Sequence, residues 1–335
     1  MLVFLLEKIT IMSKKLLIID FDTPIVRCAS MCQTSYVAIN KITGEEYPVQ
    51  SQKAFLEKID PKFHDKFRFE WKPQPLKPAA DKTADKTVME HPEYLGMHAL
   101  NKEIENMIAL TSYWAYDVKF VIHKEGNHRN DIATIAEYKG NRKEKPIFTP
   151  QIKEHAIKKL GDKVVLAVGR ESDDIIAEYL YNEYKRVGDR KEHFNVVAGG
   201  IDFDLLQCVG WHYNYNKNTL QWIDKTIAAR NFWEPVLSGD ASDNIKGIVD
   251  VPDQVREEFN LGKRKGIGDK TAEKLLSDCG SPKEMLERIV YLYRAQYPNN
   301  WFDVLEENCK LLYLSRFEGD IFCLSSRLEM FGIDF

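Results

Sequence analysis

The chain has 335 residues, of which 44% are hydrophobic and 11% aromatic, enough to bury the core of one large α/β domain and a smaller one. Its formal net charge of −4 excludes a uniformly basic nucleic-acid binder, although a local basic face is compatible with that total. No stretch approaches the roughly 18 consecutive apolar residues that a membrane-spanning helix needs. We therefore expect a cytoplasmic protein with no membrane partner and with reduced cysteines.

The first element predicted is a buried strand at Leu16–Ile19, and the more natural start of the chain is Met12, so the residues before it are expected to be an upstream extension. Apolar runs bounded by turns predict three more strands, at Val118–Ile122, Val164–Ala167 and Phe194–Ala198. Helical patterns lie between the strands, around 99–115, 150–160 and 173–187. The segments "WHYNYN" and "TLQWI" predict a hairpin that turns at Asn216–Asn218. This alternation predicts an α/β fold with a mainly parallel sheet flanked by helices.

Two regions depart from that alternation. Residues 41–98 are rich in Lys, Pro and Asp, and they predict a long surface insertion that is at least partly irregular. After about residue 235 the pattern changes to short helices with Gly-rich links. We therefore expect an α/β domain over 1–235, a helical subdomain over 236–300, and a C-terminal segment, 301–335, that packs back on the core.

Acidic residues follow the predicted strands. The first strand ends in "IDFDTP", with Asp20 and Asp22, and the later acids lie in "GRESDDIIAEYL", "GIDFDLLQ" and "SGDASDN". If these acids converge at the carboxyl edge of the sheet, their repulsion would destabilise the fold unless hard divalent cations were bound. Two Mg²⁺ ions roughly 4 Å apart would suit hydrolysis of a phosphodiester.

A phosphatase with Asp20 as its nucleophile remains an alternative. "IIDFDTP" resembles the haloacid-dehalogenase motif, with its Thr shifted by one position. That family also needs a late acidic motif, and Gly239, Asp240 and Asp243 are spaced one residue too tightly for it.

Five sequence blocks, in order, resemble the 5′ nuclease family, which includes flap endonucleases, the 5′-nuclease domain of bacterial DNA polymerase I and bacteriophage 5′→3′ exonucleases. The blocks are "LIIDFDTPIVR", "EYKGNR", "ESDDIIA", "GIDFDLLQ" and "GDASDNIKG…GIGDKTAEKLL". The resemblance covers roughly residues 15–40 and 118–280. It implies a core like that of PIN nucleases, with a helical arch over 137–160 and a helix–three-turn–helix that binds DNA within 236–300.

The resemblance also implies roles for individual residues. The metal ligands would be Asp20, Glu171, Asp173, Asp174, Asp202, Asp204, Asp240 and Asp243. Lys139 and Arg142, placed one turn apart on a helix, would contact the scissile phosphate as catalytic residues. The DNA-binding residues would be Tyr138, which stacks on a base or simply packs, with Lys263, Arg264, Lys265, Gly266, Gly268, Lys270 and Lys274. The implied cofactors are two Mg²⁺ ions, with Mn²⁺ as a substitute, and a K⁺ ion at the helix–three-turn–helix.

The chain departs from the family pattern in three places. His123 stands where the family has a metal-binding Asp, and Asp22 is an extra carboxylate that could compensate for it. Phe21 replaces a Gly, and residues 248–265 lengthen the helix–three-turn–helix. These changes leave open a binder of branched DNA that has lost catalysis.

The activity implied by the resemblance is 5′→3′ exonuclease and flap endonuclease cleavage of DNA, and of RNA in RNA–DNA hybrids. It would serve replication, primer removal or recombination, beside replication proteins. A single-purpose chain of this kind resembles a bacteriophage enzyme that works in the host cytoplasm.

Overall fold

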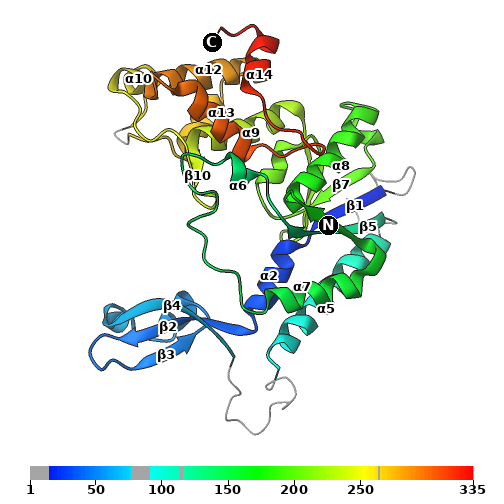
Figure 1. The fold of residues 1–335 in the computed structure, drawn as a ribbon, viewed down its shortest axis with the longest axis vertical. Helices are drawn as coiled ribbons and strands as arrows, with labels where there is room; N and C mark the ends of the chain where they lie inside the picture. Colours follow the sequence, from blue (N-terminus) through cyan, green and yellow to red (C-terminus); the bar gives the residue numbers. More distant parts are fainter. Residues whose placement is uncertain (1–14, 77–90, 114–115, 263–264, 335) are drawn as a thin grey trace. The chain divides into compact units, whose positions relative to one another are not determined.

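The computed structural model describes residues 15–76, 91–113, 116–262 and 265–334. Met12, Lys263 and Arg264 lie outside these residues. The chain divides into two units (Figure 1). The first takes the described parts of 1–20, 115–142 and 165–335, and the second takes those of 21–114 and 143–164.

A six-stranded sheet organises the first unit, in the order β6-β5-β1-β7-β8-β9. The strands are β1 (Lys15–Asp20), β5 (Tyr116–Glu125), β6 (Val164–Val168), β7 (Val196–Gly199), β8 (Gly210–Asn214) and β9 (Thr219–Ile223). β1 lies parallel to both β5 and β7, and β7 lies parallel to β8. β9 lies antiparallel to β8, so the sheet is mainly parallel and the predicted α/β fold is confirmed.

Apolar side chains explain why β1 occupies the middle of the sheet. Leu17, Ile18 and Ile19 are at most 1% exposed, as expected for a strand covered on both faces. The predicted strands and the predicted hairpin are confirmed, and Asn218 lies in the hairpin turn with a positive φ of 52°. Asn accepts this left-handed conformation more readily than most residues.

Helix α8 (Ser172–Val187) packs on the sheet through Ile176, Ala177 and Leu180, which are fully buried. These positions recur on one face at helical spacing. The helix ends at Gly188, where φ is +63°. The predicted helix at 173–187 is therefore confirmed.

The rest of the first unit is largely helical. After the short α6 (Arg129–Ile132) and η4 (Asp204–Gln207), it contains α9 (Lys225–Ser238), α10 (Asp253–Glu258), α11 (Asp269–Leu276), α12 (Pro282–Gln296), α13 (Trp301–Leu312) and α14 (Leu324–Phe331). One continuous apolar core joins these helices, from Phe232 to Leu328. α13 packs on α9, α12 and α6. The domain boundary expected at residue 235 falls inside α9. The expected division into a catalytic domain, a DNA-binding subdomain and a C-terminal segment stays a prediction.

The second unit combines three helices with a small sheet. α2 (Asp22–Ser30), α5 (Glu93–Tyr113) and α7 (Thr149–Leu160) pack against one another. β2 (Gln33–Asn40) lies between β3 (Glu46–Val49) and β4 (Phe67–Pro75) in an antiparallel sheet, and α3 (Gln52–Leu56) and the 3₁₀ helix η1 (Pro61–Lys66) lie between β3 and β4.

The segment 41–98 was predicted to be an insertion that is at least partly irregular. Its residues 41–75 contain more regular structure than predicted, namely β3, α3, η1 and β4. In β4, Phe67, Phe69 and Trp71 alternate with charged residues, and that period of two is the signature of a strand. The Lys and Pro content of the segment obscured this pattern. Of the helices described, none is long and apolar enough to cross a membrane.

Candidate metal and phosphate site

The acidic blocks of the first unit meet at one edge of its sheet. Asp20 is the last residue of β1 and is 5% exposed. Ile19 pairs with Gly199 in β7, so the loop that carries Asp202 and Asp204 leaves the sheet beside Asp20. Glu171 caps the N-terminus of α8, directly after β6. The carboxyl ends of parallel strands thus bring these acids together, as the sequence predicted.

Asp173 is buried among four other acidic side chains. Its Oδ1 atom is buried and has no hydrogen-bond partner among the described residues. Burial raises the pKa of the Asp173 carboxyl well above its usual value, and the charges of Asp20, Asp202, Asp204 and Glu171 raise it further. An unpaired buried carboxylate oxygen beside other acids is costly, and a bound cation would satisfy it.

Asp204 links this group to the loop that follows α9. Burial raises the pKa of Asp204 to about 7, and the charges of Asp240, Asp243 and Asp202 act in the same direction. Burial also raises the pKa of Asp202, where Arg142 and Lys139 oppose it. The acids therefore share one electrostatic field.

The donor set fits hard divalent cations in charge and in atom type, since all of these ligands are carboxylate oxygens. Within the described ranges, no group of three or more His, Cys, Asp or Glu side chains is arranged so that it could hold a metal ion. The acids thus gather in one region, but their side chains are not drawn around one point.

Arg142 and Lys139 lie in a turn and not on a helix, so the predicted helix at 137–142 is wrong. Lys139 has a φ of +58°, which a helix does not allow, and its backbone N–H donates to the Asp243 carbonyl at 2.9 Å. The arch expected over 137–160 is helical only from Thr149, in α7. The two cations are nevertheless held beside the acids: Lys139 contacts Glu171, and Arg142 contacts Asp243.

The turn that carries these cations docks on the acidic loop 240–244. Asn141 donates to the Ala241 carbonyl at 2.6 Å, and Asn244 donates to the Glu137 carbonyl at 2.9 Å. Arg142 adds a hydrogen bond from Nε to the Ser242 carbonyl at 2.9 Å. These backbone contacts fix the positive turn against the negative loop.

The stem of the acidic loop requires glycine at both ends. The hairpin of β10 (Gly239–Asp240) and β11 (Ile245–Lys246) brings Gly239 and Gly247 together, and a Cβ atom at Gly247 would overlap the backbone of Leu237 and Gly239. Gly239 also has a φ of +79°. Only glycine meets both conditions without strain.

Tyr138 packs inside this site. Its side chain is 6% exposed, and its hydroxyl lies 2.7 Å from the Asp243 carboxylate and 3.1 Å from the Glu171 carboxylate, so that its single proton is donated to one of the two at a time. Burial and the charge of Glu171 raise the pKa of the phenol, so it keeps its proton and acts as a donor. Of the two roles expected for Tyr138, packing agrees with this burial, and contact with DNA stays a prediction.

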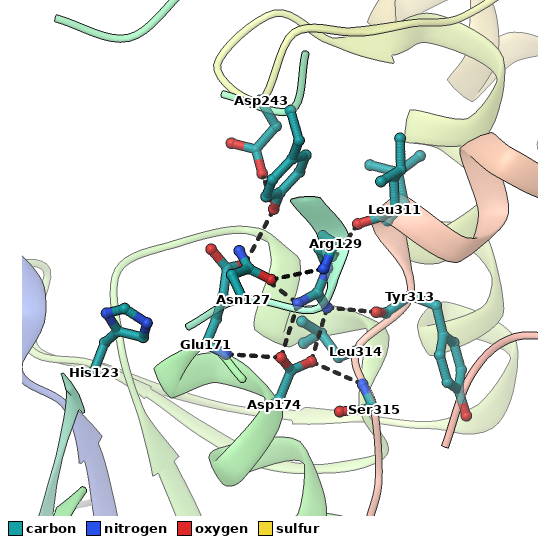
Figure 2. A network of polar contacts seen from close by, with 12 residues as sticks. His123, Asn127, Arg129, Glu171, Asp174, Asp243, Leu311, Tyr313, Leu314 and Ser315 are labelled. Atoms are coloured by element: carbon teal, nitrogen blue, oxygen red, sulfur yellow. Dashed lines mark hydrogen bonds and ion pairs between the residues drawn. The ribbon is translucent and has the colours of Figure 1, made fainter. Parts of the chain in front are cut away.

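Arg129 forms the most extensively bonded ion pair of the site, with Asp174 (Figure 2). Arg129 is 1% exposed and Asp174 is fully buried, and two hydrogen bonds of 2.8 Å join them. The guanidinium also donates to the carbonyls of Leu311 at 2.9 Å and Tyr313 at 2.6 Å. The Ser315 backbone N–H donates to Asp174 at 2.8 Å.

Both oxygens of Asp174 therefore accept hydrogen bonds from Arg129. One of them also accepts from the Ser315 backbone N–H, and the other accepts from the Glu171 backbone N–H. Burial alone would raise the pKa of Asp174, but Arg129 outweighs burial and holds that pKa below its usual value. Asp174 therefore drops out of the proposed ligand set. Nothing in the sequence singles out Arg129, because it stands in a polar segment, "GNHRNDI", and its partners are distant along the chain.

His123 and Asp22, the two further metal ligands considered, lie on β5 and α2. His123 lies near the end of β5, where its Nε2 atom hydrogen-bonds the Gly126 carbonyl at 2.8 Å, and Figure 2 shows its ring away from the Arg129–Asp174 pair. Asp22 opens α2 and belongs to the second unit, where its charge acts on Lys153. The metal role considered for His123 and Asp22 stays a prediction.

The residues expected to bind DNA have different environments. Gly268 caps α11 without a side-chain hydrogen bond, and Lys270 in its first turn is exposed. Lys265 pairs with Asp250 at 3.6 Å, and Gly266 approaches the Val249 carbonyl, which a Cβ would meet at 3.2 Å. Lys274 donates to the Asn260 carbonyl at 2.9 Å, so it holds α11 to the end of α10.

Comparison with known proteins gives one match to a curated protein. No model of a protein family matches the chain. The chain is similar to a 5′-3′ exonuclease of Bacillus subtilis (strain 168), with 27% identity over 206 residues, which are 58% of this chain and 62% of that protein. The match thus spans less than two thirds of the relative's length. It supports the resemblance to the 5′ nuclease family.

Two solved structures are also similar, both of bacteriophage T5 D15. One is the protein co-crystallised with metal ions, at 17% identity and a TM-score of 0.37, covering 63% of this chain and 91% of that one. The other is a flap endonuclease pseudo-enzyme–product complex with DNA and metal ions, at 15% identity and a TM-score of 0.35, covering 63% and 89%.

Proposed function

We propose that this chain is a metal-dependent 5′→3′ exonuclease and flap endonuclease that hydrolyses phosphodiester bonds of DNA. The observation that carries the proposal is the buried, unpaired Oδ1 of Asp173, which lies among other acids and near two cations that dock on an acidic loop. The similarity to a 5′-3′ exonuclease supports the same class of reaction.

The residues that would hold two Mg²⁺ ions, or Mn²⁺ in their place, are Asp20, Glu171, Asp173, Asp202, Asp204, Asp240 and Asp243. When bound, such ions supply positive charge that activates water and neutralises charge on the phosphate oxygens. All of the proposed ligands are carboxylates, as hard cations require.

Lys139 and Arg142 would contact the scissile phosphate and stabilise the negative charge that develops on it. Asp243 holds Arg142 in place, and Glu171 holds Lys139. Tyr138 orients Asp243 through its hydroxyl. The role of these residues is to present two positioned cations next to the metal ligands.

The N-terminus of α11, with Gly266, Gly268, Lys265 and Lys270, would bind the DNA backbone, with a K⁺ ion between protein and phosphate. Lys263 and Arg264, which lie outside the described residues, stay predicted DNA-binding residues. We propose that the substrates include RNA in RNA–DNA hybrids. We also propose that the protein acts in replication, primer removal or recombination in the cytoplasm, together with replication proteins.

One assay tests the proposal. End-labelled flap, blunt and hybrid oligonucleotides are incubated with Mg²⁺ or Mn²⁺, and the products are sized. Release of short 5′ fragments that stops when Asp202 is changed to Asn is expected. Intact substrates under all conditions, with DNA still bound, would identify a branched-DNA binder, and a phosphorylated Asp20 would identify a phosphatase.

A further inference from the structure

A cavity of about 570 Å³ lies in the first unit, away from the acids already described. It is bounded by α8, η4, α9 and the segment 313–331, and Figure 1 shows the chain beyond α13 passing close to α8. Small-molecule sites have volumes of about 300–1,000 Å³. Seven aromatic side chains line it: Tyr181, Tyr184, Phe232, Trp233, Tyr313, Phe322 and Phe331.

Two arginines stand on this aromatic wall. The guanidinium of Arg316 lies 5.3 Å from the ring centres of both Tyr181 and Tyr313. The guanidinium of Arg327 lies 5.9 Å from the ring centre of Phe322. Such stacking positions a guanidinium while leaving its N–H groups available to an acceptor.

No carboxylate neutralises either guanidinium in the part of the chain that the structure describes. The nearby Asp320 carboxylate accepts from the Tyr313 hydroxyl and from the Arg316 backbone N–H, each at 2.9 Å. Lys225 also lines the cavity, but it pairs with Asp189 at 2.9 Å. The cavity thus combines an aromatic wall with two unneutralised positive charges.

We propose that this cavity binds a nucleoside 5′-monophosphate, with the base against the aromatic wall and the phosphate on Arg316 and Arg327. An apolar ligand would leave both guanidinium groups unpaired, and inorganic phosphate would leave the aromatic wall without a partner. A guanidinium recognises phosphate through two parallel N–H bonds, and aromatic rings stack on any base. The site is separate from the proposed nuclease centre, although η4 carries Asp204 and also Gln207, which lines the cavity.

Calorimetric titration of the whole chain with dAMP and dTMP tests this binding. EDTA is present throughout, so that no divalent ion can hold a nucleotide at the acidic site. Saturable binding is expected, and changing Arg316→Gln and Arg327→Gln together should weaken it at least tenfold. The matched control is Arg294→Gln, because Arg294 stacks on Trp301 at 4.6 Å and does not line the cavity.

Each single arginine variant is titrated as well, so that the test stands if the double variant does not fold. Deoxyadenosine and inorganic phosphate should each bind at least tenfold more weakly than dAMP. Three results would overturn the proposal: no saturable binding at millimolar nucleotide, equal affinity for phosphate alone, or equal weakening by Arg294→Gln. Asp202→Asn should leave nucleotide binding unchanged, so failure of the proposed nuclease function is seen separately from failure of this site.

Discussion

The guanidinium of Arg129 holds both carboxylate oxygens of Asp174 through two hydrogen bonds of 2.8 Å, in a place that solvent does not reach. The same carboxylate caps α8 by accepting from the Glu171 backbone N–H. Glu171 and Asp173 stand in the same first turn of α8 as Asp174. The Arg129–Asp174 ion pair therefore fixes the backbone that carries these two acids. We regard Arg129 as a positioning residue.

Changing Arg129 to Met should destabilise the fold by about 3–5 kcal/mol, because it leaves the buried Asp174 charge without a partner. Urea unfolding monitored by circular dichroism measures this. The double variant Arg129→Met with Asp174→Leu removes both charges and should be closer to the unmodified chain. A single variant as stable as the unmodified chain would show that the pair is not a buried ionic contact.

Changing Asp173 to Asn should abolish DNA cleavage and yet raise the melting temperature in metal-free buffer. The substitution removes a charge that is repelled by Asp20, Asp202, Asp204 and Glu171. Asp303→Asn, an exposed change on α13, is the control and should affect neither quantity. Cleavage at the unmodified rate would remove Asp173 from the proposed metal site.

Changing Lys139 to Ala should lower the turnover number for a flap substrate by about 100- to 1,000-fold, since it removes a positioned cation from the transition state. Affinity for the same DNA should change much less, because Lys139 contacts Glu171 and lies within the site. Lys217→Ala, in the exposed turn between β8 and β9, serves as the control. Equal losses in turnover and affinity would reassign Lys139 to general phosphate binding.

The two lysines of α11 should respond differently to substitution. Lys270→Ala should weaken DNA binding and reduce the slope of log affinity against log salt by about one unit, as expected for one lost phosphate contact. Lys274→Ala should mainly lower the melting temperature, because its ammonium holds the Asn260 carbonyl. Fluorescence anisotropy at several salt concentrations separates the two effects, and identical salt slopes for both variants would contradict the assignment.

His212 should make the fold acid-sensitive. Burial lowers the pKa of His212 from 6.5 to about 4, and its Nε2 atom hydrogen-bonds the Cys208 carbonyl at 2.8 Å. Between pH 6.5 and pH 4, His212 binds a proton in the unfolded chain but stays neutral in the folded chain. The free energy of unfolding therefore falls as the pH drops from 6.5 towards 4, by about 3 kcal/mol for this group.

His212→Gln keeps a hydrogen-bond donor but does not titrate. The difference in unfolding free energy between the two proteins should therefore change across this pH window and be constant above pH 7.5. Urea unfolding at half-unit pH steps measures the difference. A constant difference down to pH 4.5 would show that His212 is protonated in the folded chain.

The elements that sequence predicted well are those whose pattern is local. The run Leu16–Ile19 marks β1, and the periodic apolar positions of 173–187 mark α8. The gathering of Asp20, Asp173 and Asp202 was predictable for a related reason, because parallel strands place their carboxyl ends at one edge.

The features that sequence did not predict depend on distant partners. The turn at Lys139 forms against the loop of Asp243, more than a hundred residues later, and that contact overrides the helical pattern of the segment. Tyr138 and Asp174 looked like residues that face a ligand, but each has a buried partner elsewhere in the chain. No local pattern reports those partners.

The contacts of Arg129 with the carbonyls of Leu311 and Tyr313 also bear on synthesis of the protein. These partners lie 182 and 184 residues further along the chain, so the ribosome makes them long after Arg129 and Asp174. A nascent chain that stops before residue 311 leaves the guanidinium short of two acceptors. Completion of the hydrogen bonds around the buried guanidinium is thereby tied to a late stage of translation.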